Sequence, residues 1–288
     1  MPKVIITTIS LLISLVVLSL LSLPDRNLHV IFCDVGQGDA ILATYGTTQI
    51  LVDGGPDSKV LSCLSRHMPF WDRTVEGVLL THPQEDHFGG LVDVVRRFEV
   101  GVFAHPDVEG TAAGWKVLKE EITRHAISEK TVHIGDIIRF TNIHFDIFNP
   151  STSSFDPELR TEGLGTSPSR DLNDYSVVGT LSFGQFDVLF TGDISPKMIP
   201  LFIDKISPVE VLKVPHHGSK NGLTRELLEK SHPVLAAISV GKNNRYGHPH
   251  SEVIRLLDDW GIRVLRTDKD GEVEVVSDGE RWWIRDSN

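Results

Sequence analysis

The sequence predicts an α/β protein in which short, largely buried β-strands outnumber the helices between them. Apolar runs rich in Val, Ile, Leu and Phe recur from residue 29 to residue 240, and such runs between polar turns are typical of strands. Helical apolar periodicity appears between some of these runs. Several of the runs end in Asp or His, which predicts polar side chains gathered at the ends of strands.

The strand candidates each contain three or more apolar residues. They are residues 29–35, 48–53, 77–82, 143–148, 176–183, 186–193, 210–214 and 234–240. The turn around Gly184 predicts a hairpin between two of them. Trp115, Leu118 and Ile122 fall at helical spacing. Ser251 is the expected N-cap of a second helix that ends before Gly261.

One segment departs from this pattern. Residues 149–170 are rich in Ser, Thr, Pro and Gly and have no apolar period. Loops of this length inside a compact domain are usually functional or disordered. Because the segment directly precedes Asn173 and Asp174, we expect it to control access of the substrate to a site near these two residues.

The N-terminal residues 4–23 carry no charged side chain. About 20 apolar residues span a bilayer as a helix, which predicts an uncleaved membrane anchor within residues 1–27 and a folded domain over 28–288. A cleaved signal peptide, which would make the protein secreted, is the alternative. Against cleavage, the run is long and no Ala-x-Ala site follows it. Lys3 favours a cytoplasmic N-terminus, with the folded domain on the outer side.

Charge and cysteine content restrict the possible partners. The 28 basic and 39 acidic residues give a formal charge of −11, which argues against a broad nucleic-acid-binding surface. A phosphate-bearing substrate would therefore need a local cationic patch or a bound metal. Cys33 and Cys63 are expected to be two buried thiols, with a disulfide as the alternative if the domain is exported.

The stretch "THPQEDHFGG", residues 81–90, has the composition of a metal site. His82, Asp86 and His87 lie between an apolar strand and a helix-like run. Imidazole and carboxylate groups are ligands of zinc and similar ions. Gln84 stands where a further histidine would complete the pattern. Other polar groups that close apolar strands are Asp53, Asp193, His216 and His217.

Together these motifs resemble the metallo-β-lactamase superfamily, and within it the extracytoplasmic domain of ComEC-type DNA-internalisation proteins. The resemblance spans roughly residues 28–276. It is carried by "FCDVGQGDAIL", "LVDGG", "THPQEDHFGG", "NDYSVV", "LFTGDI", "LKVPHHGS", "NNRYGHPH" and "RTDKDGEVEV". It implies an αββα sandwich of two mixed β-sheets flanked by helices. Full ComEC proteins also carry a many-helix membrane channel, so we expect a tethered hydrolase domain with any DNA channel as a separate partner.

The resemblance also implies two unequal metal positions. One has its full ligand set in Asp86, His87, Asp193 and His216. The other keeps His82 and shares Asp193, with Gln84 and Asp174 as possible oxygen ligands. Oxygen ligands shift metal preference from zinc toward manganese or magnesium. We therefore expect one tight divalent ion and a second, weaker one, with Zn or Mn favoured and Mg possible.

The candidate catalytic residues are Asp86, His217 and His248, the last two as contacts to a phosphate or leaving oxygen. Asp39 and Asp53 are expected to orient metal-binding histidines without touching the metal. The expected function is metal-dependent hydrolysis, with DNA as the substrate that the resemblance implies. Two alternatives remain open. One is hydrolysis of a different ester, such as a lactone, a choline phosphate or a β-lactam. The other is a non-catalytic DNA- or partner-binding module with a degenerate metal site.

Overall fold

A computed structural model describes residues 24–151 and 171–285, together with the isolated positions 7, 9, 11 and 13. Its strands form two mixed sheets, one in the order β15-β14-β1-β2-β3-β4-β5-β6 and the other in the order β13-β12-β11-β10-β9-β8-β7. Each sheet contains a parallel half, made by β3 to β6 in the first and by β10 to β13 in the second.

The first sheet consists of β1 (Leu28–Phe32), β2 (Ile41–Tyr45), β3 (Thr48–Val52), β4 (Thr74–Leu79), β5 (Glu99–His105), β6 (Ser128–Thr131), β14 (Val273–Ser277) and β15 (Trp282–Arg285). The second consists of β7 (Ile137–Phe140), β8 (Ile143–Asn149), β9 (Val178–Phe183), β10 (Phe186–Phe190), β11 (Val211–Lys213), β12 (Leu235–Ile238) and β13 (Arg263–Arg266).

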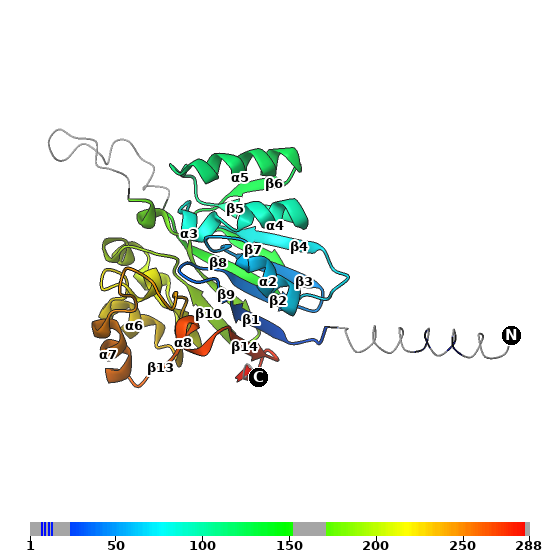
Figure 1. Ribbon diagram of the computed structural model, residues 1–288. Helices are drawn as coiled ribbons and strands as arrows, with labels where there is room; N and C mark the ends of the chain where they lie inside the picture. The colour runs from blue at the N-terminus through cyan, green and yellow to red at the C-terminus, as the bar shows by residue number, and fades with distance from the viewer. Residues whose placement is uncertain are drawn as a thin grey trace.

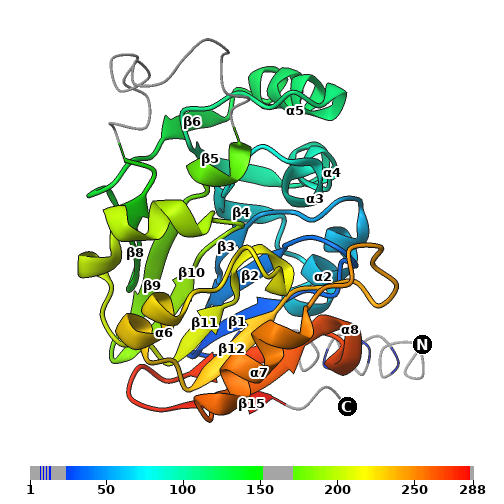
Figure 2. The same ribbon diagram turned by 90° about the vertical axis from the view of Figure 1, so that its left-hand side faces the viewer.

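Helices cover the outer face of each sheet (Figures 1 and 2). On the first sheet lie α2 (Lys59–His67), α3 (Glu85–Phe88), α4 (Leu91–Arg97) and α5 (Ala113–Arg124), and on the second lie α6 (Arg225–Ser231) and α7 (Ser251–Asp259). The short α8 (Thr267–Asp270) follows β13, and 3₁₀ turns occur at η3 (Leu172–Tyr175), η4 (Pro196–Leu201), η5 (Ile203–Lys205) and η6 (Pro215–Gly218). This is the predicted αββα sandwich, and the fold prediction is confirmed.

The apolar runs are continuous because most central strands are buried on both faces. In β1, Val30 and Phe32 point into the core between the sheets, whereas Ile31 packs under the helices. Successive side chains of a strand point to opposite faces, so a strand covered on both sides must be apolar at every position. The long apolar runs in the sequence therefore correspond to strands of the two sheets, which are the inner layers of the sandwich.

Local predictions mostly match the structure. The Gly184 turn joins β9 to β10 as a hairpin, and Trp115, Leu118 and Ile122 lie buried on α5. The prediction for Ser251 is wrong by one residue: Ser251 is the first helical residue of α7, and His250 is the N-cap. His250 takes this place because its backbone N–H donates to Gly218 O (2.9 Å), which holds it in an extended conformation before the helix begins.

Two predicted segments cannot be placed. The anchor over residues 4–23, apart from the isolated positions given above, and the loop over 152–170 lie outside the described residues. Among the helices of the described part of the chain, none combines the length and the apolar character needed to cross a bilayer. Both the anchor and the gating loop stay predictions.

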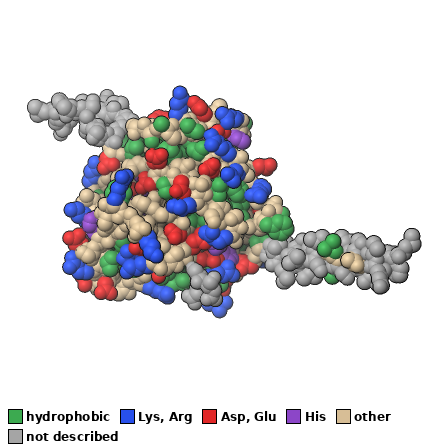
Figure 3. Space-filling view, in the orientation of Figure 1, with side chains coloured by type: hydrophobic (Ala, Val, Ile, Leu, Met, Phe, Trp, Pro, Cys, Tyr) green, Lys and Arg blue, Asp and Glu red, His purple; other side chains and the backbone are tan. Residues whose placement is uncertain are grey.

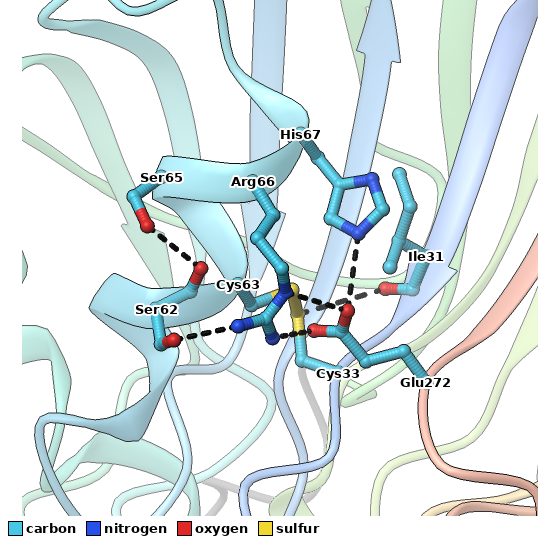
Figure 4. Close-up of a disulfide and its surroundings, with 8 residues drawn as sticks. All are labelled: Ile31, Cys33, Ser62, Cys63, Ser65, Arg66, His67 and Glu272. Carbon is cyan, nitrogen blue, oxygen red and sulfur yellow. Dashed lines mark hydrogen bonds and ion pairs between the residues drawn. A yellow bond between two sulfur atoms is a disulfide. The ribbon is translucent and has the colours of Figure 1, made fainter. Parts of the chain in front are cut away.

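Cys33 and Cys63 are buried, as expected, but they are joined by a disulfide, so the preferred prediction of two free thiols is wrong (Figure 4). The bond links the end of β1 to α2 across a sequence separation of 30. Next to it, Glu272 accepts hydrogen bonds from Arg66 and contacts the His67 ring (3.2 Å). The two cysteines come together only when α2 folds back over the sheet, which sequence spacing does not reveal.

Replacing both cysteines by alanine should destabilise the fold. For a closed loop of this length, chain entropy in the unfolded state predicts a loss of about 3–4 kcal/mol in the free energy of unfolding. Urea denaturation of the Cys33→Ala/Cys63→Ala protein and of reduced and oxidised wild type would measure it. The reduced wild type should behave like the double variant. An unchanged denaturation midpoint in both would show that the cross-link does not stabilise this fold.

Candidate metal centre

The candidate site lies where several strands end. Asp53 follows β3, His82 follows β4, Asp193 follows β10 and His217 follows β11, while Asp39 comes from the turn after β1. Parallel neighbours end at the same edge of a sheet, so β3 with β4 and β10 with β11 deliver their polar residues to one place. The two sheets thus meet at a polar edge.

Two glycines allow these loops to approach closely. A side chain at Gly38 would lie 2.2 Å from the carbonyl oxygen of Asp86, and one at Gly90 would lie 2.1 Å from that of Gly54. The backbone of Asp39 instead donates to Asp86 O (3.2 Å). The glycines of "GQGD" and "HFGG" therefore bring the Asp39 turn and the Asp53 loop against α3.

Four residues form the centre of the site. Asp86, His87, Asp193 and His217 each offer a ligand atom, and these atoms all lie within 4.8 Å of one another. Asp193 lies 3.4 Å from His87 Nε2 and 3.3 Å from His217 Nε2, and Asp86 lies 3.5 Å from His217 Nε2. We call this group the four-residue cluster.

The cluster fits a divalent cation. Within the described residues, the buried atoms His87 Nε2, His217 Nε2 and Asp193 Oδ1 have no hydrogen-bond partner. A buried polar atom without a hydrogen bond reduces the stability of the fold. Here two imidazole nitrogens and one carboxylate oxygen in this state face one another. Two imidazoles and two carboxylates form a donor set that zinc or manganese accepts. A bound cation would satisfy all of these atoms at once.

Hydrogen bonds fix which ring nitrogen of each histidine faces the cluster. His87 Nδ1 donates to Asp53 Oδ2 (2.7 Å), and His217 Nδ1 donates to the carbonyl oxygen of Ser239 (2.9 Å). With each Nδ1 acting as a donor, the Nε2 lone pair is free to bind a metal. Asp53 therefore lies where the orienting role expected from the sequence requires it, and the role itself stays a prediction.

His82 is held in the same way but lies to one side. The Thr81 hydroxyl donates to Asp53 Oδ2 (2.7 Å) and accepts from His82 Nδ1 (3.1 Å). The buried His82 ring lies 4.1 Å from that of His87, and its Nε2 has no hydrogen-bond partner among the described residues. Burial and the neighbouring His87 lower the pKa of His82 to about 3. His82 thus offers a neutral imidazole beside the cluster. A ligand for a second cation would need this protonation state.

The two histidines of the turn lie differently from what their predicted roles imply, and those roles stay predictions. His217, expected to contact the substrate, is buried within the cluster, whereas His216, expected to bind metal, has 28% of its side chain exposed, with Nε2 3.7 Å from Asp193 Oδ2. Both residues have left-handed backbone angles, with φ of 51° and 53°. The turn therefore sends the second ring inward and leaves the first at the rim.

Lys213 is a buried charged residue of the site that sequence reasoning missed. Its buried ammonium pairs with Asp39, donates to Gly192 O (3.0 Å) and lies 3.6 Å from Asp193 Oδ1. Asp39 also lies 3.4 Å from His217 Nδ1. The one available signal was a lysine inside the apolar run of β11. Asp39 lies beside the cluster and pairs with Lys213, and the orienting role expected of it stays a prediction.

The carboxylates and imidazoles of the cluster stabilise each other's charged forms. Although burial opposes both shifts, Asp193 together with Asp53 raises the pKa of His87, and Asp193 together with Asp39 raises that of His217, well above the usual value. Against the effect of burial, His217 and His87 lower the pKa of Asp193 well below its usual value. The site is therefore strongly polarised to hold positive charge between its carboxylates.

The suggested oxygen ligands of the weaker position each have one polar partner. Asp174 pairs with Lys197 (2.7 Å), and Gln84 Nε2 donates to Asn173 Oδ1 (2.7 Å). Gln84 still lines the cavity in front of the cluster, whereas Asp174 is not among the described residues that line it. Gln84 thus remains placed for a role at the second position. Asp174 lies outside this wall; its Oδ2 pairs with Lys197, and its Oδ1 is buried with no hydrogen-bond partner among the described residues.

The cavity in front of the cluster has a volume of about 700 Å³ and includes His216, His217, Asp86 and Asp193 in its wall. His248 lines it as well, with its ring 5.8 Å from that of His216. Burial and the nearby His217 and His216 lower the pKa of His248 to about 4. His248 is therefore a neutral hydrogen-bonding group at the rim, within reach of a substrate in the cavity.

Asp53→Asn should weaken metal binding without removing a ligand. The change takes away the charge that orients His87 Nδ1, and losses of such partners typically cost about 10–100-fold in metal affinity or activity. Chelator competition with Zn²⁺ or Mn²⁺ would measure the affinity. The matched control is Asp204→Asn, whose side chain is 91% exposed. Equal affinities for both variants would refute the orienting role.

Gln84→His should strengthen the second position. The new imidazole would stand next to His82 and add a nitrogen ligand, which favours zinc. Zinc content after dialysis should rise toward two ions per chain, whereas the exposed turn variant Gln185→His should leave it unchanged. A zinc content identical to that of wild type would argue against a second position between Gln84 and His82.

The comparisons with known proteins agree with this geometry. Residues 33–242 match the metallo-β-lactamase superfamily. Among solved structures, the metallo-β-lactamase fold protein YhfI from Bacillus subtilis superposes with a TM-score of 0.54 at 12% identity, over 84% of this chain and 97% of that one. At that identity the likeness shows the fold alone.

Curated relatives extend the match. ComE operon protein 3 of Bacillus subtilis is 26% identical over 261 residues, which cover 84% of this chain and 32% of the relative. Recombination protein 2 of Haemophilus influenzae is 28% identical over 246 residues, 84% of this chain and 28% of the relative. Exodeoxyribonuclease YycJ of Bacillus anthracis is 26% identical over 121 residues, 42% of this chain and 44% of the relative.

This chain thus spans about a third of the length of the first two relatives. The superfamily match covers most of the chain and includes the loops that carry Asp53, the four-residue cluster and Lys213. The two-sheet architecture and the polar edge between the sheets agree with it. The chain therefore belongs to the metallo-β-lactamase superfamily.

Proposed function

We propose that this protein is a metal-dependent phosphodiesterase that cleaves DNA outside the cytoplasm. The observation that carries the proposal is the four-residue cluster with its unpaired buried ligand atoms, three of whose residues, Asp86, Asp193 and His217, line a cavity open to substrate. A divalent cation held there would supply Lewis acidity and make water more acidic, as phosphodiester hydrolysis requires.

The chain's own residues account for binding and orientation. Asp53 and the Ser239 carbonyl orient His87 and His217, so the nitrogen ligands are set before substrate arrives. Lys213 and Asp39 hold the base of the site. His248, neutral and at the rim, can donate a hydrogen bond to a phosphate oxygen or accept a proton.

DNA is favoured as substrate by the names of the relatives, one of which is an exodeoxyribonuclease. The formal charge of −11 means that a nucleic acid must be held locally. On the face seen in Figure 3, acidic and basic side chains are interspersed. A cation in the cluster, together with the few basic side chains around the cavity, would provide the local positive charge.

The location is supported by two features. Disulfides persist in oxidising compartments and are rare in the cytosol, and Cys33–Cys63 is such a bond. The charge-free residues 4–23 have the length of a bilayer-spanning segment. Together they favour a domain held on the outer surface of the membrane, or secreted if the segment is cleaved.

The test is hydrolysis by the purified full chain of labelled single- and double-stranded DNA, in EDTA and with Mn²⁺, Mg²⁺ or Zn²⁺ added. Cleavage should require the metal and should be lost in His87→Ala. Hydrolysis of nitrocefin, a lactone or a phosphocholine ester, with no cleavage of DNA, would refute DNA as the substrate. If the protein binds metal but hydrolyses none of these compounds, it is a binding module and not an enzyme.

A further inference from the structure

A short loop crosses the mouth of the cavity, and the metal site does not account for the side chains at its tip. This rim loop, residues 241–250, connects β12 to α7. Asn244 holds it in shape: its Nδ2 donates to the carbonyl oxygens of Gly241 (2.9 Å) and His248 (2.8 Å), and its Oδ1 accepts from His248 N (2.9 Å). The loop is therefore a pre-formed structure with a fixed tip.

The rim loop is also tied to both turns that build the site. His250 N donates to Gly218 O (2.9 Å), next to His217, and Gly241 N donates to Gln37 Oε1 (3.2 Å), in the turn that carries Asp39. Its position relative to the four-residue cluster is thus set by direct hydrogen bonds. Groups at its tip are placed with respect to the reacting centre, as positioning of a substrate demands.

The tip presents one large aromatic and one cationic side chain. Tyr246 is 54% exposed, and the guanidinium carbon of the exposed Arg245 lies 5.5 Å from the centroid of its ring. Both residues line the cavity. An aromatic ring that stays exposed over a polar cavity adds little to the stability of the fold. Its exposure on a pre-formed loop therefore points to a ligand with a planar group that stacks on it.

The rings form a path outward from the cluster. His216 at the cluster rim lies 5.8 Å from His248, and His248 lies 5.7 Å from Tyr246, stacked at 25°. Tyr246 is therefore the outermost of three neighbouring rings that begin beside Asp193. A phosphodiester with its phosphate at the cluster would carry its next substituent along this path.

The two sides of the cavity differ in charge. Glu85 and Asp86 lie in the wall near the cluster, whereas Arg245 lies in the wall formed by the rim loop. The acidic side suits the cation, and the guanidinium suits a second, neighbouring phosphate. Arginine pairs well with phosphate oxygens, and aromatic rings stack on bases of any sequence.

We propose that the rim loop is a nucleotide-binding element in which Tyr246 stacks on the base next to the scissile phosphate and Arg245 pairs with the following phosphate. The inference rests on the proposed function and deepens it, because it requires the substrate to carry a planar base. The two residues are specificity determinants and take no part in bond cleavage. Stacking on Tyr246 would be independent of base identity.

The test compares two oligonucleotides with the same phosphates, a thymidine oligomer and an abasic oligomer with a tetrahydrofuran spacer at each position. Binding of cleavage-resistant phosphorothioate versions of both oligomers to the full chain is followed by fluorescence anisotropy with Mn²⁺ present, and hydrolysis of the phosphodiester versions is followed separately with Mn²⁺. Wild type should bind the thymidine oligomer at least about fivefold more tightly, as expected for loss of one stacked base. Hydrolysis should show the same difference in KM with little change in kcat.

The variants separate the two roles. Tyr246→Ala should remove the preference for the thymidine oligomer, and Tyr246→Phe should keep it. Arg245→Gln should weaken both oligomers equally and reduce the salt dependence of binding. Trp71→Ala is the matched control, since this 46% exposed aromatic precedes β4 and so lies at the strand end away from the site.

Outcomes for the rim loop and for the proposed function differ. Wild type that binds both oligomers equally, or binds neither, would overturn the nucleotide-binding role, as would a preference that persists in Tyr246→Ala. A Tyr246-dependent preference in binding, without hydrolysis under any of the three metals, would support the rim loop and refute the phosphodiesterase.

Discussion

His217→Ala should remove the tightly held cation and reduce hydrolysis by more than about 100-fold. The change deletes an imidazole that faces both Asp86 and Asp193, and its cost should exceed the 10–100-fold typical of residues that only orient a ligand. Metal content after dialysis and turnover of a phosphodiester would measure the two losses separately.

The adjacent residue supplies the control. His216→Ala removes the same side chain one position earlier, but at the partly exposed rim. It should keep the cation and lose less activity. The opposite pattern, with the cation lost in His216→Ala and kept in His217→Ala, would mean that the second histidine is not the ligand and that the turn faces the other way in solution.

Lys213→Met should destabilise the metal-free protein by about 3–5 kcal/mol, because removing one partner of a buried ion pair leaves an uncompensated charge. Lys213 and Asp39 are each about 1% exposed and contact each other directly. Urea denaturation in EDTA would measure the loss. In the double variant Lys213→Met/Asp39→Asn no buried carboxylate remains at position 39, and much of the stability should return.

The effect of Lys213→Met should depend on pH. Burial disfavours the charged form of Asp39, but Lys213 and His217 lower its pKa below the ordinary value of 3.8. A carboxyl group with a lowered folded-state pKa stabilises the fold above its unfolded pKa, and this contribution disappears as the pH falls through the folded value. The difference between wild type and Lys213→Met should therefore be full near neutral pH and shrink in acid. A difference independent of pH would point to lost packing instead of lost charge.

Much of the architecture was readable from the sequence. The apolar runs that became β1, β3 and β12 are continuous because strands between two covered faces must be apolar throughout, whereas the run that became β8 alternates because it is buried on one face. The polar residues that close them had to meet at sheet edges. Glycines in "GQGD" and "HFGG" and the Asp and His residues nearby supported the superfamily resemblance, and with it the sandwich and a metal site.

Within the site, some details depended on backbone direction. His216 and His217 are chemically the same, and two consecutive left-handed residues decide which ring enters the cluster. No periodicity predicts side-chain direction through such a turn, because the φ values there are set by the packing of the turn as a whole. The histidine that enters the cluster is therefore His217, one residue after the one expected from the sequence.

The sequence by itself determined the chemical inventory and the order of strands whose ends carry it. Only the tertiary structure decided which partners these groups find: the disulfide between Cys33 and Cys63, the pairing of Lys213 with Asp39, and the capture of Asp174 by Lys197. The physical reason is that burial and pairing energies depend on contacts between residues far apart in the chain. Those distances are set by how the helices pack on the sheets and how the sheets pack on each other, and the order of residues does not state them.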